Sequence, residues 1–411
     1  MSRKVLIICR SYYPHYGPQA QRMASFAKHL PKFGWEPVVL CPESTPQNDS
    51  KYDPKLVGKD PGRTIRVPYN ISGTRRRIDF LVRKALKDLS LEVLLFWSPV
   101  RIYRDLLARA DLLLQEEKFD AILATTGSPL TLAIADKVSG RYHTPWVADF
   151  RDIPAQHIAN LHRFSPRHLY IKLHKDCCKS ATSLVTTTES LRERLTQWQD
   201  KPVSLVYNGF DPDNLHQDLK PSKDYFTLTY CGSIHDTANP ESLLDALDLI
   251  LERDPGKLEH FRLLIHGVSK ICFRRHFASR RCSALIHNKG HVSFEDSIKA
   301  QQEACALLFL SYAGMKGVIT AKLLEYLGSD RPVLSVPGDE VTTTLLSETQ
   351  AGTAASTAEQ IARILLEWID QWQRTCKIEY NPRPDKIQFY TRENQTKLLA
   401  QVLDQVVTTV V

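Results

Sequence analysis

Lys322 and Glu325 are the two residues whose types and spacing suggest chemistry most directly. They lie three residues apart, so on a helix both side chains share one face and can reach one ligand. A lysine ammonium binds a diphosphate as a point charge, and a carboxylate accepts hydrogen bonds from a diol such as that of ribose. The pair therefore predicts a nucleotide-diphosphate site. The alternative is a solvated Lys–Glu pair on an ordinary surface helix, since such pairs are common and weak.

The segment 317–338 contains the elements that would position this pair. Its first half has apolar residues four apart, which predicts a short helix, and residues 333–336 read as a buried parallel strand. The helix start offers unpaired N–H groups and a partial positive charge of roughly half a unit. Gly317 lets the backbone approach a ligand closely, and we assign Ile319 and Thr320 beside it to substrate binding. The apolar stripe of this helix is Ile319, Leu323 and Leu327.

The tetrad 149–152, with the sequence D-F-R-D, carries the second concentration of chemistry. Asp149 or Asp152 could orient an acceptor hydroxyl, and Arg151 could pair with a carboxylate or phosphate. The alternative is an internal Arg–Asp pair that pins the end of a strand. We assign Asp149, Arg151 and Asp152, together with Lys322, to catalysis.

The first half of the chain alternates short apolar runs with helical patterns. This order predicts a doubly wound α/β sheet, in which ligands bind beyond the carboxyl ends of the strands. The loop that holds His15 and Gly17 lies in such a place, and so does the loop that holds Gly127. We assign His15 and Gly17 to substrate binding. The predicted strands are 4–10, 36–41, 121–124, 145–148, 183–187 and 203–207, and the predicted helices are 19–30, 130–138 and 189–198.

The second half repeats this alternation. Gly232 and Gly267 each follow a predicted strand. Residues 42–72 are rich in Pro, Asp, Asn and Ser, and they predict a long excursion from the first sheet. The predicted strands are 226–230, 261–266, one that ends at 292–293, 305–311 and 333–336, and the predicted helices include 240–251 and a last one that reaches 407.

The segment 317–334, with its K-x-x-E-Y-L and R-P-V-L runs, resembles the donor-binding segment of the retaining GT-B glycosyltransferases, the large family-4-like group. In that group the glutamate that matches Glu325 holds the ribose of the nucleotide sugar. Many members carry a second glutamate eight residues earlier, where this chain has Gly317. The D-F-R-D strand end and the N-G-x-D run at 208–211 also resemble elements of this group. The resemblance implies GT-B architecture, retention at the anomeric carbon and no metal or other cofactor.

The same resemblance extends to the glycine-bearing loops. The loop of His15 and Gly17 is similar to the first loop of the group, where acceptor and sugar meet, with Pro18 at the usual second glycine. The counterpart of Gly232 approaches the diphosphate, and the loop of Gly267 frames the base. The T-G-S-P loop of Gly127 faces the predicted interdomain cleft in a subset of relatives. The resemblance therefore implies substrate binding by Gly127, Gly232 and Gly267.

Composition bounds the class of protein. The 411 residues leave room for two domains, and 43% hydrophobic with 24% charged residues is the mix of a soluble globular chain. Nine cysteines without a C-x-x-C pair favour neither a disulfide framework nor a zinc site, and a reducing cytoplasm fits best. No apolar run approaches the ~20 residues of a membrane span. The net charge of +8 is compatible with anionic substrates, lipid surfaces or nucleic acid.

Residues 74–110 combine arginine and lysine with aromatic and aliphatic side chains at helical spacing. Such a stretch can lie on an anionic membrane surface, so peripheral contact with the inner membrane face is one interpretation. The other is an ordinary amphipathic helix pair with a solvated face. Asp211 and Asp213 have the D-x-D spacing of a metal site, but they fall in a polar linker and are read as turn formers.

We predict two doubly wound Rossmann-like domains that face an interdomain cleft. The first spans 1–207, a linker spans 208–225, the second spans 226–387, and a C-terminal helix at 388–411 crosses back to the first domain. The predicted activity is transfer of a sugar from a UDP-linked donor to a hydroxyl of a sugar or lipid-linked acceptor in polysaccharide or glycolipid assembly. Leaving-group stabilisation by Lys322 and its helix end is the main catalytic contribution.

Two rival functions share this fold. The departure at Gly317 motivates a protein of an assembly complex that binds the nucleotide sugar without turning it over. A sugar-nucleotide epimerase is the other. Nucleic-acid binding is not predicted, because the basic residues belong to no recognisable module.

Overall fold

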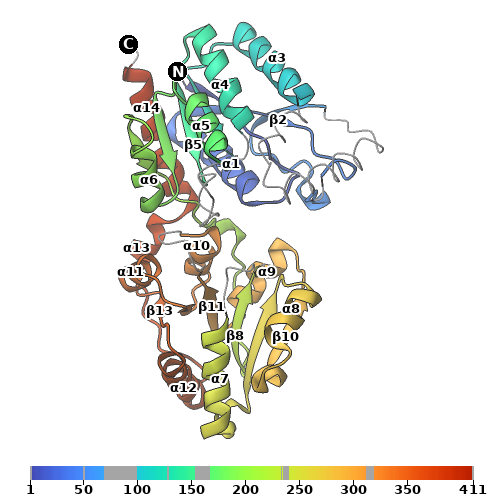
Figure 1. Ribbon diagram of the computed structural model, residues 1–411, viewed down its shortest axis with the longest axis vertical. Helices are drawn as coiled ribbons and strands as arrows, with labels where there is room; N and C mark the ends of the chain where they lie inside the picture. The colour runs from blue at the N-terminus through green and yellow to red at the C-terminus, as the bar shows by residue number, and fades with distance from the viewer. Residues whose placement is uncertain are drawn as a thin grey trace. The chain divides into compact units, whose positions relative to one another are not determined.

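The computed structural model describes residues 2–49, 51–68, 100–126, 129–152, 167–232, 234, 240–311 and 319–409 (Figure 1). The chain divides into two compact units. Unit 1 comprises Met1–Tyr207 together with Arg392–Val411, and unit 2 comprises Asn208–Thr391.

Unit 1 is built on a parallel sheet with the strand order β3-β2-β1-β4-β5-β6-β7. The order reverses direction between β1 and β4, and a doubly wound sheet binds its ligands at such a switch point. The strands are β1 (Arg3–Ile8), β2 (Trp35–Pro42), β3 (Arg63–Val67), β4 (Ala121–Thr125), β5 (Trp146–Phe150), β6 (Ser183–Thr186) and β7 (Val203–Leu205). The helices are α1 (Pro18–His29), α3 (Val100–Glu116), α4 (Pro129–Tyr142), α5 (Arg167–Cys177), α6 (Glu189–Thr196) and α14 (Arg392–Thr409).

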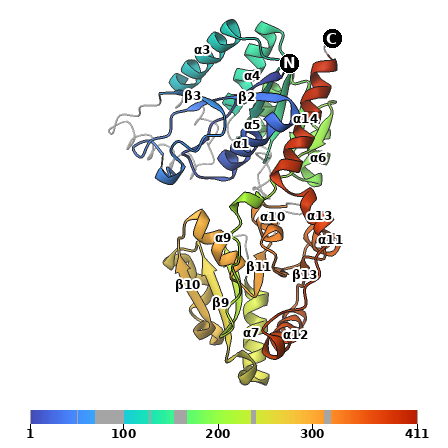
Figure 2. The ribbon, with the colours of Figure 1, turned by 180° about the vertical axis from the view of Figure 1, so that it is seen from behind.

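Helices cover both faces of this sheet. Alternate residues of the strands point to opposite faces, so the inner strands β1, β2, β4, β5 and β6 contribute to two apolar clusters. One cluster packs the sheet against α3, α4 and α6, and the other packs it against α1 and α14. Helix α14 comes from the end of the chain, yet it lies in unit 1 beside α1 (Figure 2). The apolar residues that α14 buries there are Leu399, Ala400, Val402, Leu403 and Val406.

Unit 2 repeats the arrangement with the strand order β10-β9-β8-β11-β12-β13, again all parallel. Its switch point lies between β8 and β11. The strands are β8 (Phe226–Cys231), β9 (Phe261–His266), β10 (Ile286–Gly290), β11 (Ala306–Leu310), β12 (Val333–Val336) and β13 (Gly352–Ala354). The helices are α7 (Glu241–Arg253), α8 (Lys270–Phe277), α9 (Phe294–Gln302), α10 (Ala321–Gly328), α11 (Glu340–Thr349), α12 (Ala358–Thr375) and α13 (Pro384–Phe389).

One apolar cluster forms the main core of unit 2. It joins β8, β9, β11 and β12 to α7 and α12, which lie side by side on one face of the sheet (Figure 1). Helix α9 contacts β8. Both predicted doubly wound α/β sheets and the returning C-terminal helix are therefore confirmed.

Three local predictions were wrong. The excursion predicted for 42–72 contains β3, a partly exposed edge strand whose charged residues hide the period-two pattern. The strand predicted to end at 292–293 ends at Gly290, and Ser293 instead caps α9 by accepting the Asp296 amide. Strand β5 continues through Asp149 and Phe150, two residues beyond the predicted strand 145–148.

Candidate functional site

Helix α10 is fixed to the end of β8 by a buried tyrosine in its second turn. The hydroxyl of Tyr326 accepts the amide of Cys231 at 2.8 Å and lies 3.4 Å from the carbonyl oxygen of the same residue. Tyr326 is fully buried, and this burial raises its pKa well above the ordinary value. Thr320 caps the helix by accepting the amide of Leu323 at 3.3 Å. The predicted short helix and buried strand are thus present, and the helix begins at the switch point of the second sheet.

Lys322 lies at this junction with a poorly solvated ammonium group. Its Nζ donates to the hydroxyl of Tyr230 at 2.7 Å and lies 4.1 Å from the centre of that ring. Burial lowers its pKa to about 8, although Cys231 and Glu325 pull in the opposite direction. An ammonium has three N–H donors. In the described part of the chain, the hydroxyl of Tyr230 is the acceptor that the Lys322 ammonium reaches. A bound anion would satisfy the remaining donors.

Two glycines make room for the lysine. A Cβ on Gly232 would lie 2.5 Å from both Cε and Nζ of Lys322, and Gly232 has a φ of +139°, which side chains rarely adopt. Gly267, at φ +89°, would place a Cβ 3.0 Å from the carbonyl group of Gly232. The ends of β8 and β9 are therefore packed backbone to backbone below the ammonium. The two predicted glycines lie next to each other, and Gly232 touches Lys322.

The remaining predicted residues of unit 2 fall around the same helix. Glu325 is half-buried on α10 one turn after Lys322, and its charge raises the pKa of the lysine. Ile319 is buried and Thr320 is the capping residue. Gly317 lies outside the described residues.

Asp149 is held by a buried ion pair in unit 1. Its carboxylate accepts Nη2 of Arg22 at 2.8 Å and the hydroxyl of Thr125 at 2.8 Å, and the side chains of Asp149 and Arg22 are 0% and 2% exposed. Arg22 also donates to the carbonyl of Tyr207 at 2.9 Å. This is the strand-pinning role named above as the alternative, with Arg22 rather than Arg151 as the partner. The carboxylate of Asp149 therefore presents no surface to a substrate.

Arg151 and Asp152 lie beyond the strand end and remain accessible. Nε of Arg151 donates to Asp152 at 2.7 Å, and the two side chains are 25% and 41% exposed. Arg151 lines a pocket of about 550 Å³ together with His15 and Gly17. Among the predicted residues of unit 1, the structure thus brings Arg151, His15 and Gly17 to one pocket. Gly127 lies outside the described residues.

Sequence reasoning missed Asp49, which lines the same pocket. Its Oδ2 lies 2.7 Å from Nδ1 of His15 and accepts the hydroxyl of Ser44 at 2.5 Å. Burial alone would raise the pKa of this carboxyl, but hydrogen bonds from Ser44, the Lys51 amide and His15 lower it below the ordinary value. The only signal in the sequence was an aspartate among other turn-forming residues in the long excursion.

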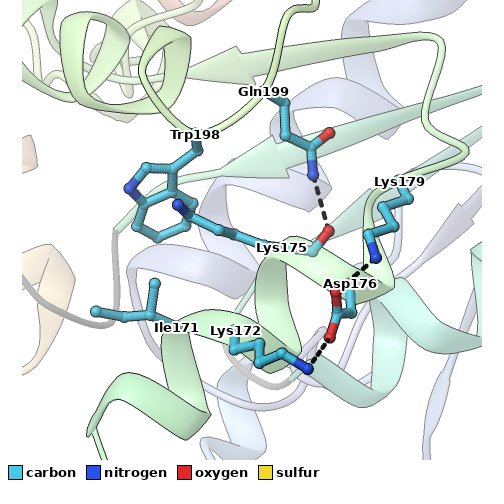
Figure 3. Close-up of a pocket in the computed structure, with 7 residues that line it drawn as sticks. All are labelled: Ile171, Lys172, Lys175, Asp176, Lys179, Trp198 and Gln199. Carbon is cyan, nitrogen blue, oxygen red and sulfur yellow. Dashed lines mark hydrogen bonds and ion pairs between the residues drawn. The ribbon is translucent and has the colours of Figure 1, made fainter.

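A second pocket of unit 1, about 420 Å³, lies between α5 and the residues after α6 (Figure 3). Its lysines are already engaged. Lys172 and Lys179 pair with Asp176 at 3.5 and 2.8 Å, and Nζ of Lys175 lies 5.3 Å from the ring centre of Trp198. We assign no site to this pocket.

The remaining predictions concern the turn of Asp211, metal sites and membrane contact. Asp211 caps the turn Pro212–Asn214 by accepting the Asp213 amide at 3.1 Å, which is the role of a turn former. In the described part of the chain, no cluster of three or more His, Cys, Asp or Glu could hold a metal ion. None of the described helices is long and apolar enough to cross a membrane. Most of the basic stretch 74–110 lies outside the described residues.

Comparisons with known proteins agree with this fold. Residues 17–209 match the family model described as glycosyl transferase 4-like domain. The structure of HepE from Anabaena in complex with UDP is similar over 98% of this chain and 100% of that chain, at 13% identity and a TM-score of 0.64. Sucrose-phosphate synthase from Thermosynechococcus elongatus is similar over 99% and 100%, at 13% identity and a TM-score of 0.67.

WaaG, a glycosyltransferase involved in lipopolysaccharide biosynthesis, is similar over 97% of this chain and 95% of that chain, at 15% identity and a TM-score of 0.55. At these identities the neighbours establish the fold, which is GT-B. No curated protein matches the sequence.

Proposed function

We propose that this family-4-like glycosyltransferase of the GT-B fold transfers a sugar from a UDP-linked donor to a hydroxyl acceptor. Unit 2 holds the nucleotide and unit 1 holds the acceptor. The observation that carries the proposal is the ammonium of Lys322, which stands over Gly232 at the switch point with Tyr230 as the acceptor of its hydrogen bond. The determination of HepE structures with UDP and with UDP-glucose supports the choice of nucleotide.

The proposed catalysis is stabilisation of the leaving diphosphate. As the bond from the anomeric carbon to the diphosphate oxygen breaks, negative charge grows on that oxygen, and Lys322 with the first-turn N–H groups of α10 stabilises it. The partly buried site strengthens this interaction, because the ammonium has little competing water. Glu325 accepts hydrogen bonds from the ribose hydroxyls. We further propose retention and no requirement for a metal, as the family resemblance implies.

The acceptor side rests on the pocket of Arg151, His15 and Gly17. We propose that Arg151 and Asp152 contact the acceptor, and that Asp149 acts only by holding the end of β5 in place. A sugar or lipid-linked acceptor, contact of residues 74–110 with an anionic membrane surface, and a cytoplasmic location stay predictions.

The test is a melting screen with UDP, GDP and ADP sugars, each with and without EDTA, followed by a turnover assay. We expect UDP sugars to raise the melting temperature, EDTA to leave that rise unchanged, and acceptor extract to release UDP. Protection without UDP release would favour the non-catalytic assembly protein. A changed sugar on the nucleotide without any acceptor would favour the epimerase, and protection that requires a divalent cation would overturn the metal-free proposal.

A further inference from the structure

The pocket of unit 1 that Arg151 lines has both polar and apolar side chains in its lining. His15, Asp49 and Arg151 contribute polar groups, whereas α3 and α4 contribute apolar side chains. Its volume of about 550 Å³ is that of a small-molecule site. The apolar side chains from α3 and α4 are Ile102, Leu106, Leu130 and Ile134.

The histidine in this pocket has a fixed ring. Nδ1 of His15 lies 2.7 Å from Oδ2 of Asp49, and the two side chains are only 21% and 14% exposed. Asp49 is itself fixed, because it accepts the hydroxyl of Ser44 on Oδ2 and the amide of Lys51 on Oδ1 at 2.9 Å. A carboxylate can only accept, so Nδ1 must carry the proton. In the neutral ring, Nε2 is then a hydrogen-bond acceptor.

Nε2 faces the start of α1. A Cβ on Gly17 would lie 3.2 Å from Nε2, which is closer than most Cβ contacts. In the described part of the chain, the hydrogen bond that the His15 ring makes is the one with Asp49. An acceptor atom on a partly buried, oriented ring is therefore present beside the pocket.

The ring pair is not needed to hold the two loops together. The backbone already joins them, because the Tyr16 amide donates to Lys51 at 2.8 Å and the Asp53 amide donates to Pro14 at 2.9 Å. His15 and Tyr52 also form an antiparallel bridge. The His15–Asp49 contact thus adds orientation of a ring to a connection that the backbone makes without it.

We propose that His15 binds a hydroxyl of the acceptor through Nε2, and that Asp49 is the positioning residue that keeps the required tautomer. The acceptor is a hydroxyl compound that lays an apolar portion against the apolar side chains from α3 and α4. This inference rests on the proposed function, since it specifies how the acceptor side of that site recognises its substrate.

Asp49→Asn is the decisive variant, because its shape is conserved and its effect on the ring is defined. The Lys51 amide requires an oxygen at the Oδ1 position, so the amide NH₂ of the new side chain must face His15. It donates to Nδ1, moves the ring proton to Nε2 and removes the acceptor. The probe is octyl glucoside below its critical micelle concentration, which offers hydroxyls and an apolar chain, titrated by calorimetry with saturating UDP present.

We expect the wild type to bind the probe and Asp49→Asn to bind it about tenfold or more weakly, which corresponds to about 1.4 kcal/mol or more. Nitrogen-15 spectra of the ring should show the proton on Nδ1 in the wild type and on Nε2 in the variant. His15→Gln should lose a similar factor, and adding Asp49→Asn to it should cost nothing more, since Asp49 acts through His15. Lys59→Gln, in the same excursion but outside the pocket lining, is the control and should bind normally.

Equal affinity of wild type and Asp49→Asn, or no binding by the wild type, would overturn the inference. UDP sugars are proposed to bind unit 2, so the rise in melting temperature that they cause should be the same in all of these variants. If that rise is absent in the wild type, the proposed function fails; if it is present while the His15 variants bind the probe normally, only this inference fails.

Discussion

At the scale of single residues, Lys322 is the group on which the proposed function depends, and its burial has a cost. The unfolded chain has a lysine pKa near 10.5, and the folded value is about 8. Below pH 8 both states carry the charge, so the folded state bears the full cost of a poorly solvated ammonium. Between pH 8 and 10.5 the unfolded chain binds the extra proton, so stability rises with pH in that window.

Lys322→Met should therefore stabilise the ligand-free protein at pH 7, by on the order of 1–3 kcal/mol, while it abolishes protection by UDP sugars. The variant should also lack the rise in stability between pH 8 and 10.5. Denaturant titrations across this pH range, with and without UDP, measure all three effects. Lys299→Met is the control, because Lys299 is an exposed residue of α9 in the same unit. A Lys322→Met protein that is protected by UDP as well as the wild type would exclude Lys322 from the site.

Donor affinity should depend on pH through the same group. The diphosphate binds the charged lysine, so between pH 7 and 10 the dissociation constant for UDP should rise, by up to tenfold per unit above pH 8. Calorimetric titrations at several pH values give this slope. A constant affinity from pH 7 to 10 would show that the diphosphate does not rely on Lys322.

The ion pair of Arg22 with Asp149 should contribute far more to the free energy of unfolding than the exposed ion pairs of the same unit. Arg22→Met leaves a carboxylate buried and unpaired, and we expect a loss of about 3–5 kcal/mol in unfolding free energy. Arg63→Met removes an accessible partner of Glu117 and should cost no more than about 1 kcal/mol. Similar losses for the two variants in urea unfolding would contradict the assignment of Asp149 to a structural role.

Site residues that lie close together in the sequence could be predicted, whereas pairs of residues that lie far apart in the sequence could not. Lys322 and Glu325 stand three residues apart on one predicted helix, so their convergence followed from helical geometry. The partner of Asp149 lies 127 residues earlier, on α1, and no local pattern links the two. Asp49 was missed for the same reason, since its meeting with His15 depends on how the excursion after β2 returns to the first loop.

At the scale of elements, the site of unit 2 is a junction of the end of β8, the end of β9 and the start of α10. Regular apolar periods predicted these elements well. The predicted strand 145–148 stops just before Asp149, whereas the pairing with Arg22 allows this charged residue to stay inside β5. The edge strand β3 was missed because its two arginines are exposed or partly exposed, so the strand does not read as a buried apolar run.

Gly232→Ala tests this junction. The added Cβ meets the end of Lys322 at 2.5 Å and forces a strained φ, so we expect a fall of tenfold or more in UDP affinity and a stability loss of about 1–2 kcal/mol. Gly256→Ala, whose Cβ would make only an ordinary 3.4 Å contact with Asp254, is the matched control in the same unit. Unchanged UDP affinity in Gly232→Ala would show that Lys322 does not contact the nucleotide.

At the scale of the whole molecule, the chain forms two units with separate apolar clusters, and its last helix completes the first of them. UDP should therefore stabilise one unit selectively. We expect the unfolding transition of unit 2 to shift by about 2.7 kcal/mol at a UDP concentration of 100 times the dissociation constant. Fluorescence of Trp372 in unit 2, in a variant with the other tryptophans replaced by phenylalanine, reports that transition. A Leu399→Ala change in α14 should lower the stability of unit 1 and leave this shift intact.

The most direct test of the account is hydrogen–deuterium exchange of the intact protein with and without UDP. We predict slowed exchange in the peptides that contain Gly232 and the first turn of α10 around Lys322, because the diphosphate accepts their N–H groups. Bound UDP that slows exchange only around the pocket of His15 and Arg151, and leaves the start of α10 unchanged, would contradict the placement of the donor in unit 2.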